Sequence, residues 1–191
     1  KPATRRVRSI KYIISLAGIL SVLSFSGLST ALVRAVARGY DGSLIRAFWL
    51  NIQWGVIITI AAGIGATYYY LNGNNLLALG LLVVGLLSPK IDSAEHYDSF
   101  LIRKKNFRFM ATLKMTRSVI TSLGMFTAIL LTKDPLLLII SYFTLHTFTT
   151  LGLFLYVRAK SQLNKSVDPE MGHLAKHTSI MNSLAIFSNS I

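Results

Sequence analysis

A stretch of 43 residues without a charged side chain, residues 47–89, constrains the fold of this chain more than any other feature. As one helix it would be about 65 Å long, roughly twice the ~30 Å hydrocarbon core of a membrane. Residues 71–75, LNGNN, contain the glycine and asparagine that are typical of turns. The tyrosines at 68–70 precede this turn, as aromatic residues do at a membrane interface. The stretch therefore predicts two antiparallel membrane-spanning helices.

The composition is that of a membrane protein rather than a soluble one. Of the 191 residues, 52% are hydrophobic and 14% are charged, against about 25% charged in soluble domains. The net charge of +13 would suit nucleic acid, but the cations are divided among short segments between apolar runs, so we expect no nucleic-acid partner. Cysteine is absent and the histidines lack metal-ligand spacing, so neither a metal nor another cofactor is expected.

The pattern predicts an all-α, polytopic membrane protein with one transmembrane domain over residues 1–191. Five full spans and the truncated start of a sixth are expected, at about residues 12–33, 47–71, 76–102, 107–131, 136–157 and 177–191. Ser43 is expected to cap the second span, Asp134 and Pro135 to begin the fifth, and residues 158–176 to form a polar loop. Because the chain begins with lysine and ends inside an apolar run, we expect it to be a fragment.

The distribution of lysine and arginine predicts the orientation, because cytoplasmic loops are enriched in both. Eleven are expected on one side, which is therefore predicted to be cytoplasmic: Arg34, Arg38, Arg46, Arg103, Lys104, Lys105, Arg108, Arg158, Lys160, Lys165 and Lys176. The other side has Lys133. The basic residues within positions 1–11 would also fall on the outer side, and the sequence gives no account of them.

Ionisable residues lie inside the third expected span. Residues 76–87 are apolar, but these 12 residues are too few to cross a membrane, which takes about 20. The helix should therefore continue through the polar positions Lys90, Asp92, Glu95, His96 and Asp98. Charged side chains at this depth cost at least ~2.5 kcal/mol each on insertion scales, so they are usually paired or functional. The alternative is that the span ends at Ser88 and an amphipathic surface helix follows.

The third and fourth spans form a predicted hairpin that reverses near residue 105. Residues equally distant from this turn lie at the same depth, which places Asp98 opposite Lys114 and Glu95 opposite Arg117. We therefore expect two intramembrane ion pairs, or groups that serve ion coupling. Lys90 and Asp92 have no such partner, and residues two apart on a helix do not face each other. His146, in the fifth span, is expected to be a hydrogen-bonded packing residue.

Two sequence patterns carry a resemblance to a known family. They are Gly27-Leu28 followed by Ala31-Leu32-Val33-Arg34 and Val36-Ala37-Arg38-Gly39, and Pro89, Asp92-Ser93 and Phe100-Leu101 followed by Lys104-Lys105 and Phe107. In these the chain resembles the polysaccharide flippases, the O-antigen and lipid-linked oligosaccharide translocases of the multidrug/oligosaccharidyl-lipid/polysaccharide exporter superfamily.

The resemblance implies a transporter of about 12 to 14 helices in two six-helix lobes around a central cavity, of which this chain is a fragment of one lobe. Such proteins move undecaprenyl-diphosphate-linked oligosaccharides across the inner or plasma membrane of bacteria and archaea during polysaccharide biosynthesis. Membrane lipids, a polysaccharide polymerase and glycosyltransferases are the expected partners beside the lipid-linked substrate.

Cations that face the cavity would hold the diphosphate in such a transporter. Arg34, Arg38 and Arg46 would stand where the headgroup enters, although ordinary positive-inside anchoring explains them as well. Lys90 is the intramembrane candidate, with Asp92 as its modulator or as a proton site.

Two other functions stay open. A cation-coupled small-molecule exporter of the same superfamily would use Asp92, Glu95 or Asp98 as its coupling carboxylate. A membrane glycosyl- or phosphotransferase is less favoured, because no loop pairs carboxylates for a metal and no nucleophile motif is present. We therefore expect a protein that is not an enzyme and has no catalytic residues.

Overall fold

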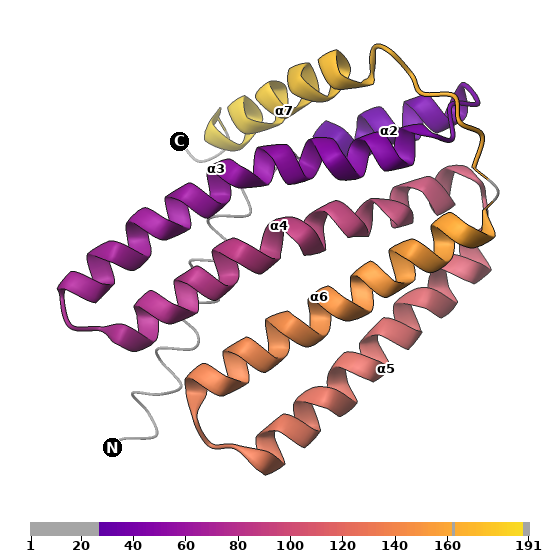
Figure 1. Cartoon of the computed structure of the whole chain (residues 1–191). Coiled ribbons are helices and arrows are strands. Elements are labelled where there is room, and N and C mark those ends of the chain that lie inside the picture. Colours follow the sequence, from indigo (N-terminus) through magenta and orange to yellow (C-terminus); the bar gives the residue numbers. More distant parts are fainter. Residues whose placement is uncertain (1–26, 162, 189–191) are drawn as a thin grey trace.

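The computed structural model describes residues 27–161 and 163–188, and every regular element in these ranges is a helix (Figure 1). The helices are α2 (Gly27–Ala37), α3 (Ser43–Leu71), α4 (Asn75–Arg103), α5 (Phe107–Leu131), α6 (Pro135–Lys160) and α7 (Met171–Ser188). Short turns connect α2, α3, α4, α5 and α6 in order, a longer segment leads from α6 to α7, and consecutive helices run up and down (Figure 1). The predicted all-α class is confirmed for the described part of the chain.

Three of these helices, α3, α4 and α6, are long and apolar enough to cross a membrane. They contain 29, 29 and 26 residues, and only 28%, 50% and 17% of their most apolar stretches is buried within the described fold. Large apolar side chains such as Ile64, Leu86 and Phe148 are exposed on them. Surface of this kind needs lipid or further helices to cover it, so the fold indicates a membrane protein.

The expected number of five full spans is not reached. Helix α5 has the predicted bounds, but its first half carries Arg108, Lys114 and Arg117 and makes it too polar to qualify as a membrane-crossing helix by composition. The expected span at 12–33 lies mostly outside the described residues. Only its end, from residue 27 on, is described, and that end forms part of α2.

The predicted loop at residues 158–176 is wrong in its extent. Helix α6 continues to Lys160 and α7 begins at Met171, before the expected start at residue 177. Arg158 and Lys160 were predicted to lie in the loop because they are charged, but they form the last turn of α6, where lysine and arginine are favourable. Asp168 marks the start of α7, since its Oδ1 accepts a hydrogen bond from the Glu170 amide at 2.9 Å.

Of the two predicted helix caps, one is confirmed. The Asp134 side chain accepts a hydrogen bond from the Leu136 amide at 2.9 Å, with Pro135 in the first turn of α6. Ser43, in contrast, is not the cap of α3, because Gly42 occupies that position. The Ser43 hydroxyl instead accepts a hydrogen bond from the amide of the buried Asp168 at 3.0 Å, which ties the α2–α3 turn to the segment before α7.

Helix α4 is the centre of the described fold. Its second half carries the fully buried Tyr97 and Phe100, which join a core formed with Leu28 and Leu32 of α2 and Leu44 of α3. Another side of α4 lies against α6, through Val84 and Ile139. Polar side chains on α4 are therefore held between neighbouring helices.

Helices α3 and α4 pack closely around a proline. Pro89 lies inside α4 and has no amide hydrogen, so the carbonyl of Gly85, four residues earlier, has no donor in its own helix. Thr59 of α3 supplies one, because its Oγ1 donates to that carbonyl at 2.8 Å. A neighbouring helix thus satisfies the backbone group that the proline leaves free, as a membrane-spanning helix requires.

We expect Thr59→Val to lower the free energy of unfolding by about 1 kcal/mol, since it leaves the Gly85 carbonyl without a donor at almost unchanged volume. Thermal unfolding in detergent measures the change. In a Pro89→Ala background the helix regains its own amide donor, so the same substitution should cost less. Thr67→Val is the matched control, because the Thr67 hydroxyl donates to Gly63 of its own helix. Equal losses at both threonines would contradict the interpretation.

The basic residues gather at one end of the helices. The turns α2–α3, α4–α5 and α6–α7 lie at that end, and α3–α4 and α5–α6 at the other (Figure 1). The eleven cations of the predicted cytoplasmic side therefore share one end, opposite Lys133. Which side faces the cytoplasm stays a prediction, and residues 1–11 lie outside the described residues.

Candidate functional site in the polar cluster of α4, α5 and α6

The α4–α5 hairpin forms both ion pairs that its register predicts. Glu95 Oε1 lies 2.5 Å from the Arg117 guanidinium, and Asp98 Oδ2 lies 3.1 Å from Lys114 Nζ. Lys105 adopts a φ of 56° at the reversal, the left-handed conformation that often ends a helix. The pairs are confirmed as contacts, whereas a role in ion coupling stays a prediction.

His146 of α6 joins this cluster. Its Nε2 lies 3.7 Å from Glu95 Oε1, and its ring stacks on Tyr142 with centroids 5.8 Å apart. The prediction for His146 was only a hydrogen-bonded packing residue. The register of a hairpin relates consecutive helices, so it gives no contact between α6 and α4. The sequence signal for the place of His146 in the cluster is a histidine in the middle of a span that has no charged side chain.

A pocket of about 330 Å³ opens between α4 and α6 beside the cluster. Its lining residues are Ser88, Ile91, Asp92, Glu95, Tyr142, Phe143 and His146. Within residues 27–161 and 163–188, Asp92 forms no hydrogen bond or ion pair, whereas Glu95 is paired with Arg117. The pocket therefore presents one unpaired carboxylate between aromatic side chains.

Lys90 is not part of this pocket. It is exposed, and two residues along a helix it points about 200° away from Asp92. Lys90 and Asp92 therefore lie on different faces of α4, and modulation of Lys90 by Asp92 stays a prediction. The expected contact of Lys90 with a diphosphate stays a prediction.

Several buried polar atoms around the ion pairs lack a hydrogen-bond partner in the described part of the chain. They are Tyr97 Oη, Asp98 Oδ1, Thr121 Oγ1, His146 Nδ1 and Thr150 Oγ1. A buried polar group that stays unsatisfied costs about 1–3 kcal/mol. His96 faces α2 instead, with its Nδ1 3.3 Å from Ser29 Oγ.

The three arginines expected near the substrate entrance differ in their surroundings. Arg38 lies 3.4 Å from Asp168 and 3.4 Å from Glu170, so its charge already has acidic partners. Arg34 and Arg46 are exposed and form no ion pair with other described residues. Lys104, one of the eleven cations of the predicted cytoplasmic side, forms an ion pair with Asp41 at 2.8 Å.

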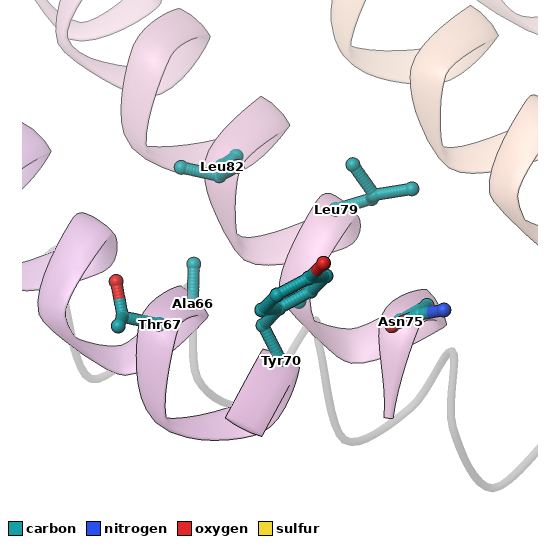
Figure 2. A pocket seen from close by; sticks show the side chains of 7 residues that line it. Ala66, Thr67, Tyr70, Asn75, Leu79 and Leu82 are labelled. Atoms are coloured by element: carbon teal, nitrogen blue, oxygen red, sulfur yellow. The ribbon is translucent and has the colours of Figure 1, made fainter. Parts of the chain in front are cut away.

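A second pocket, of about 410 Å³, lies at the opposite end of the helices. Figure 2 shows its side chains, which come from the end of α3 and the start of α4 and include Tyr70, Asn75 and Leu79. None of the lining residues is charged. This pocket has the character of a lipid-facing groove and offers less chemistry than the one at Asp92.

Among the described residues, no group of three histidine or acidic side chains is placed to hold a metal ion. Comparison of the chain with protein-family models, with curated proteins and with solved structures finds no match. A functional proposal therefore rests on the fold, the charged cluster and the sequence resemblance.

Proposed function

We propose that this chain is part of a flippase that moves undecaprenyl-diphosphate-linked oligosaccharide or O-antigen units across the inner or plasma membrane of a bacterium or archaeon. In this proposal α3 to α6 are full spans, a further full span precedes them at residues 12–33, and α7 begins a sixth. Together they make up one lobe of a larger transporter. The sequence resemblance to polysaccharide flippases gives the substrate class.

The charged cluster on α4, α5 and α6 is the observation that carries the proposal. Two carboxylates, a lysine, an arginine and a histidine meet beside helices that are apolar enough to span a membrane. Groups that are so costly in lipid mark substrate or ion pathways in membrane proteins. Ion pairs between helices also offer contacts that can break and re-form as a cavity changes the side to which it opens.

The basic end of the helices supports an anionic substrate. Arg34 and Arg46 project there without acidic partners among the described residues, so both are available to a diphosphate. Arg38 is less available, because Asp168 and Glu170 hold it. A headgroup bound at this end would meet Arg34 and Arg46 before the intramembrane charges.

Replacement of Arg34 with glutamine is expected to reduce transport about tenfold or more at unchanged membrane abundance, since a charge-assisted hydrogen bond contributes ~1.5–3 kcal/mol. Lys165→Gln is the matched control, because Lys165 is an exposed cation at the same end of the fold. Equal, small losses of transport in both variants would indicate that Arg34 only anchors its helix at the membrane surface. Full activity of the Arg34 variant would remove it from the site.

The function itself can be tested by reconstitution. Proteoliposomes that contain the full-length protein and a fluorescent undecaprenyl-diphosphate-linked oligosaccharide should expose the whole fluorophore pool to an impermeant quencher. Protein-free vesicles should keep the inner-leaflet share protected. In the source organism, deletion should remove surface polysaccharide and leave lipid-linked units on the cytoplasmic leaflet, and a normal surface glycan would contradict the proposal.

A cation-coupled exporter of small molecules is the second candidate. The unpaired carboxylate of Asp92 beside an aromatic pocket favours it, because a coupling ion needs a carboxylate that no fixed cation neutralises. Increased drug resistance on overexpression, with no change in surface polysaccharide on deletion, would favour this function over the flippase.

A further inference from the structure

The pocket between α4 and α6 has the chemistry of a site for a positively charged organic group. Its one carboxyl group without an ion-pair partner among the described residues is Asp92, while Arg117 offsets the charge of Glu95. A carboxylate without a counter-charge in a membrane-spanning helix is costly, at least ~2.5 kcal/mol on insertion scales. A cationic ligand would remove this cost, whereas an anion would meet repulsion from Asp92.

The aromatic side of the pocket distinguishes an organic cation from a metal ion. Tyr142 and Phe143 line the pocket from α6, opposite Asp92 on α4. Rings of this kind attract ammonium groups through their π faces, and cages of aromatic residues are a common way to bind them. A hard metal ion would instead need about six oxygen ligands, and the described residues lining this pocket do not supply them.

The size of the pocket fits a small ligand. A volume of about 330 Å³ lies at the lower end of the ~300–1,000 Å³ range of small-molecule sites. The hydroxyl of Ser88 and the ring of His146 supply further polar groups in the lining of the pocket. A ligand with one ammonium group and one or two hydroxyls would match these groups.

We propose that the Asp92 pocket between α4 and α6 binds an organic ammonium group, with Asp92 as the counter-charge and Tyr142 and Phe143 as the aromatic wall. The proposal does not depend on flippase activity. The ammonium group can belong to a free small molecule or to an amino sugar. Both sources share the same chemistry, and different probes separate them.

Equilibrium binding to the purified full-length protein tests the proposal with matched probes. Choline represents a free ammonium ion, and 3,3-dimethylbutan-1-ol is its neutral equivalent of the same shape. Glucosamine and glucose form the corresponding pair for a sugar-borne amine, because a hydroxyl replaces the ammonium group at nearly the same shape. At least one charged probe is expected to bind about tenfold more tightly than its neutral equivalent, a difference of ~1.4 kcal/mol. The tighter charged probe identifies the source.

Substitutions locate the binding. Asp92→Asn keeps the shape of the side chain and is expected to abolish the preference for the charged probe, and Tyr142→Leu to weaken binding severalfold. Asp98→Asn is the control, because Asp98 is paired with Lys114 and does not line the pocket. If Asp92→Asn fails to fold, the comparison of charged and neutral probes in the unsubstituted protein still decides.

Absence of binding by both charged probes would overturn the proposal, as would equal binding of charged and neutral probes. Binding that Asp92→Asn leaves unchanged, or that Asp98→Asn weakens as much, would overturn it too. None of these outcomes bears on the movement of lipid-linked oligosaccharide, which the reconstitution measures separately.

Discussion

Replacement of Arg117 with alanine is expected to lower the free energy of unfolding by about 3 kcal/mol. The substitution leaves Glu95 without its guanidinium partner, and removal of one member of a buried ion pair costs ~3–5 kcal/mol because the other charge stays uncompensated. The lower end of this range applies, because the Glu95 side chain is 38% exposed. Thermal unfolding in detergent measures the loss.

Lys114→Ala breaks the second ion pair of the same hairpin and leaves Asp98 without its ammonium partner. The Asp98 side chain is only 19% exposed, so a loss of similar size, about 3 kcal/mol, is expected. The double substitution Glu95→Gln with Arg117→Gln should recover most of the stability that Arg117→Ala loses, because no charge remains unpaired. An Arg117→Ala protein as stable as the parent would show that the pair does not stabilise this fold.

The ion pairs could be predicted from the sequence because the position of the turn in a helical hairpin fixes which residues of its two helices lie at the same depth. Once the reversal was placed near Lys105, the distance of each residue from the turn fixed its depth, and opposite charges met. The α3–α4 turn and the cap at Asp134 could be predicted from local residue types, glycine and asparagine for the turn and aspartate before proline for the cap. These features depend on residues that are close in sequence or related by one turn.

The pocket could not be predicted in the same way. It depends on α4 and α6 lying side by side, and these helices are separated in sequence by all of α5 (Figure 1). No local sequence pattern indicates which nonconsecutive helices are neighbours. The prediction for His146 was therefore packing only, and the residues of α6 that lie beside Asp92 could not be predicted. Likewise, the sequence does not indicate that the Thr59 hydroxyl donates to the Gly85 carbonyl on another helix, which Pro89 leaves without a donor.

The contact between α3 and α4 rests on glycines that permit a close approach. A Cβ added at Gly55 would collide with the Pro89 side chain, and one added at Gly85 would collide with the Cβ of Ala62. Small residues at such positions let membrane helices pack through their backbones, where dispersion and interhelical hydrogen bonds replace the hydrophobic effect. The position of α4, and with it the whole charged cluster, depends on this contact.

We therefore expect Gly85→Leu to destabilise the protein by about 3 kcal/mol or more, since the added side chain forces α3 and α4 apart and breaks the Thr59 hydrogen bond. Gly63→Leu is the matched control, because no atom lies within 4 Å of a Cβ at that position. Leucine there should be neutral or stabilising by up to ~1 kcal/mol, because glycine is a poor helix former. Thermal unfolding of the two variants side by side gives the comparison, and equal stabilities would show that α3 and α4 do not pack through Gly85.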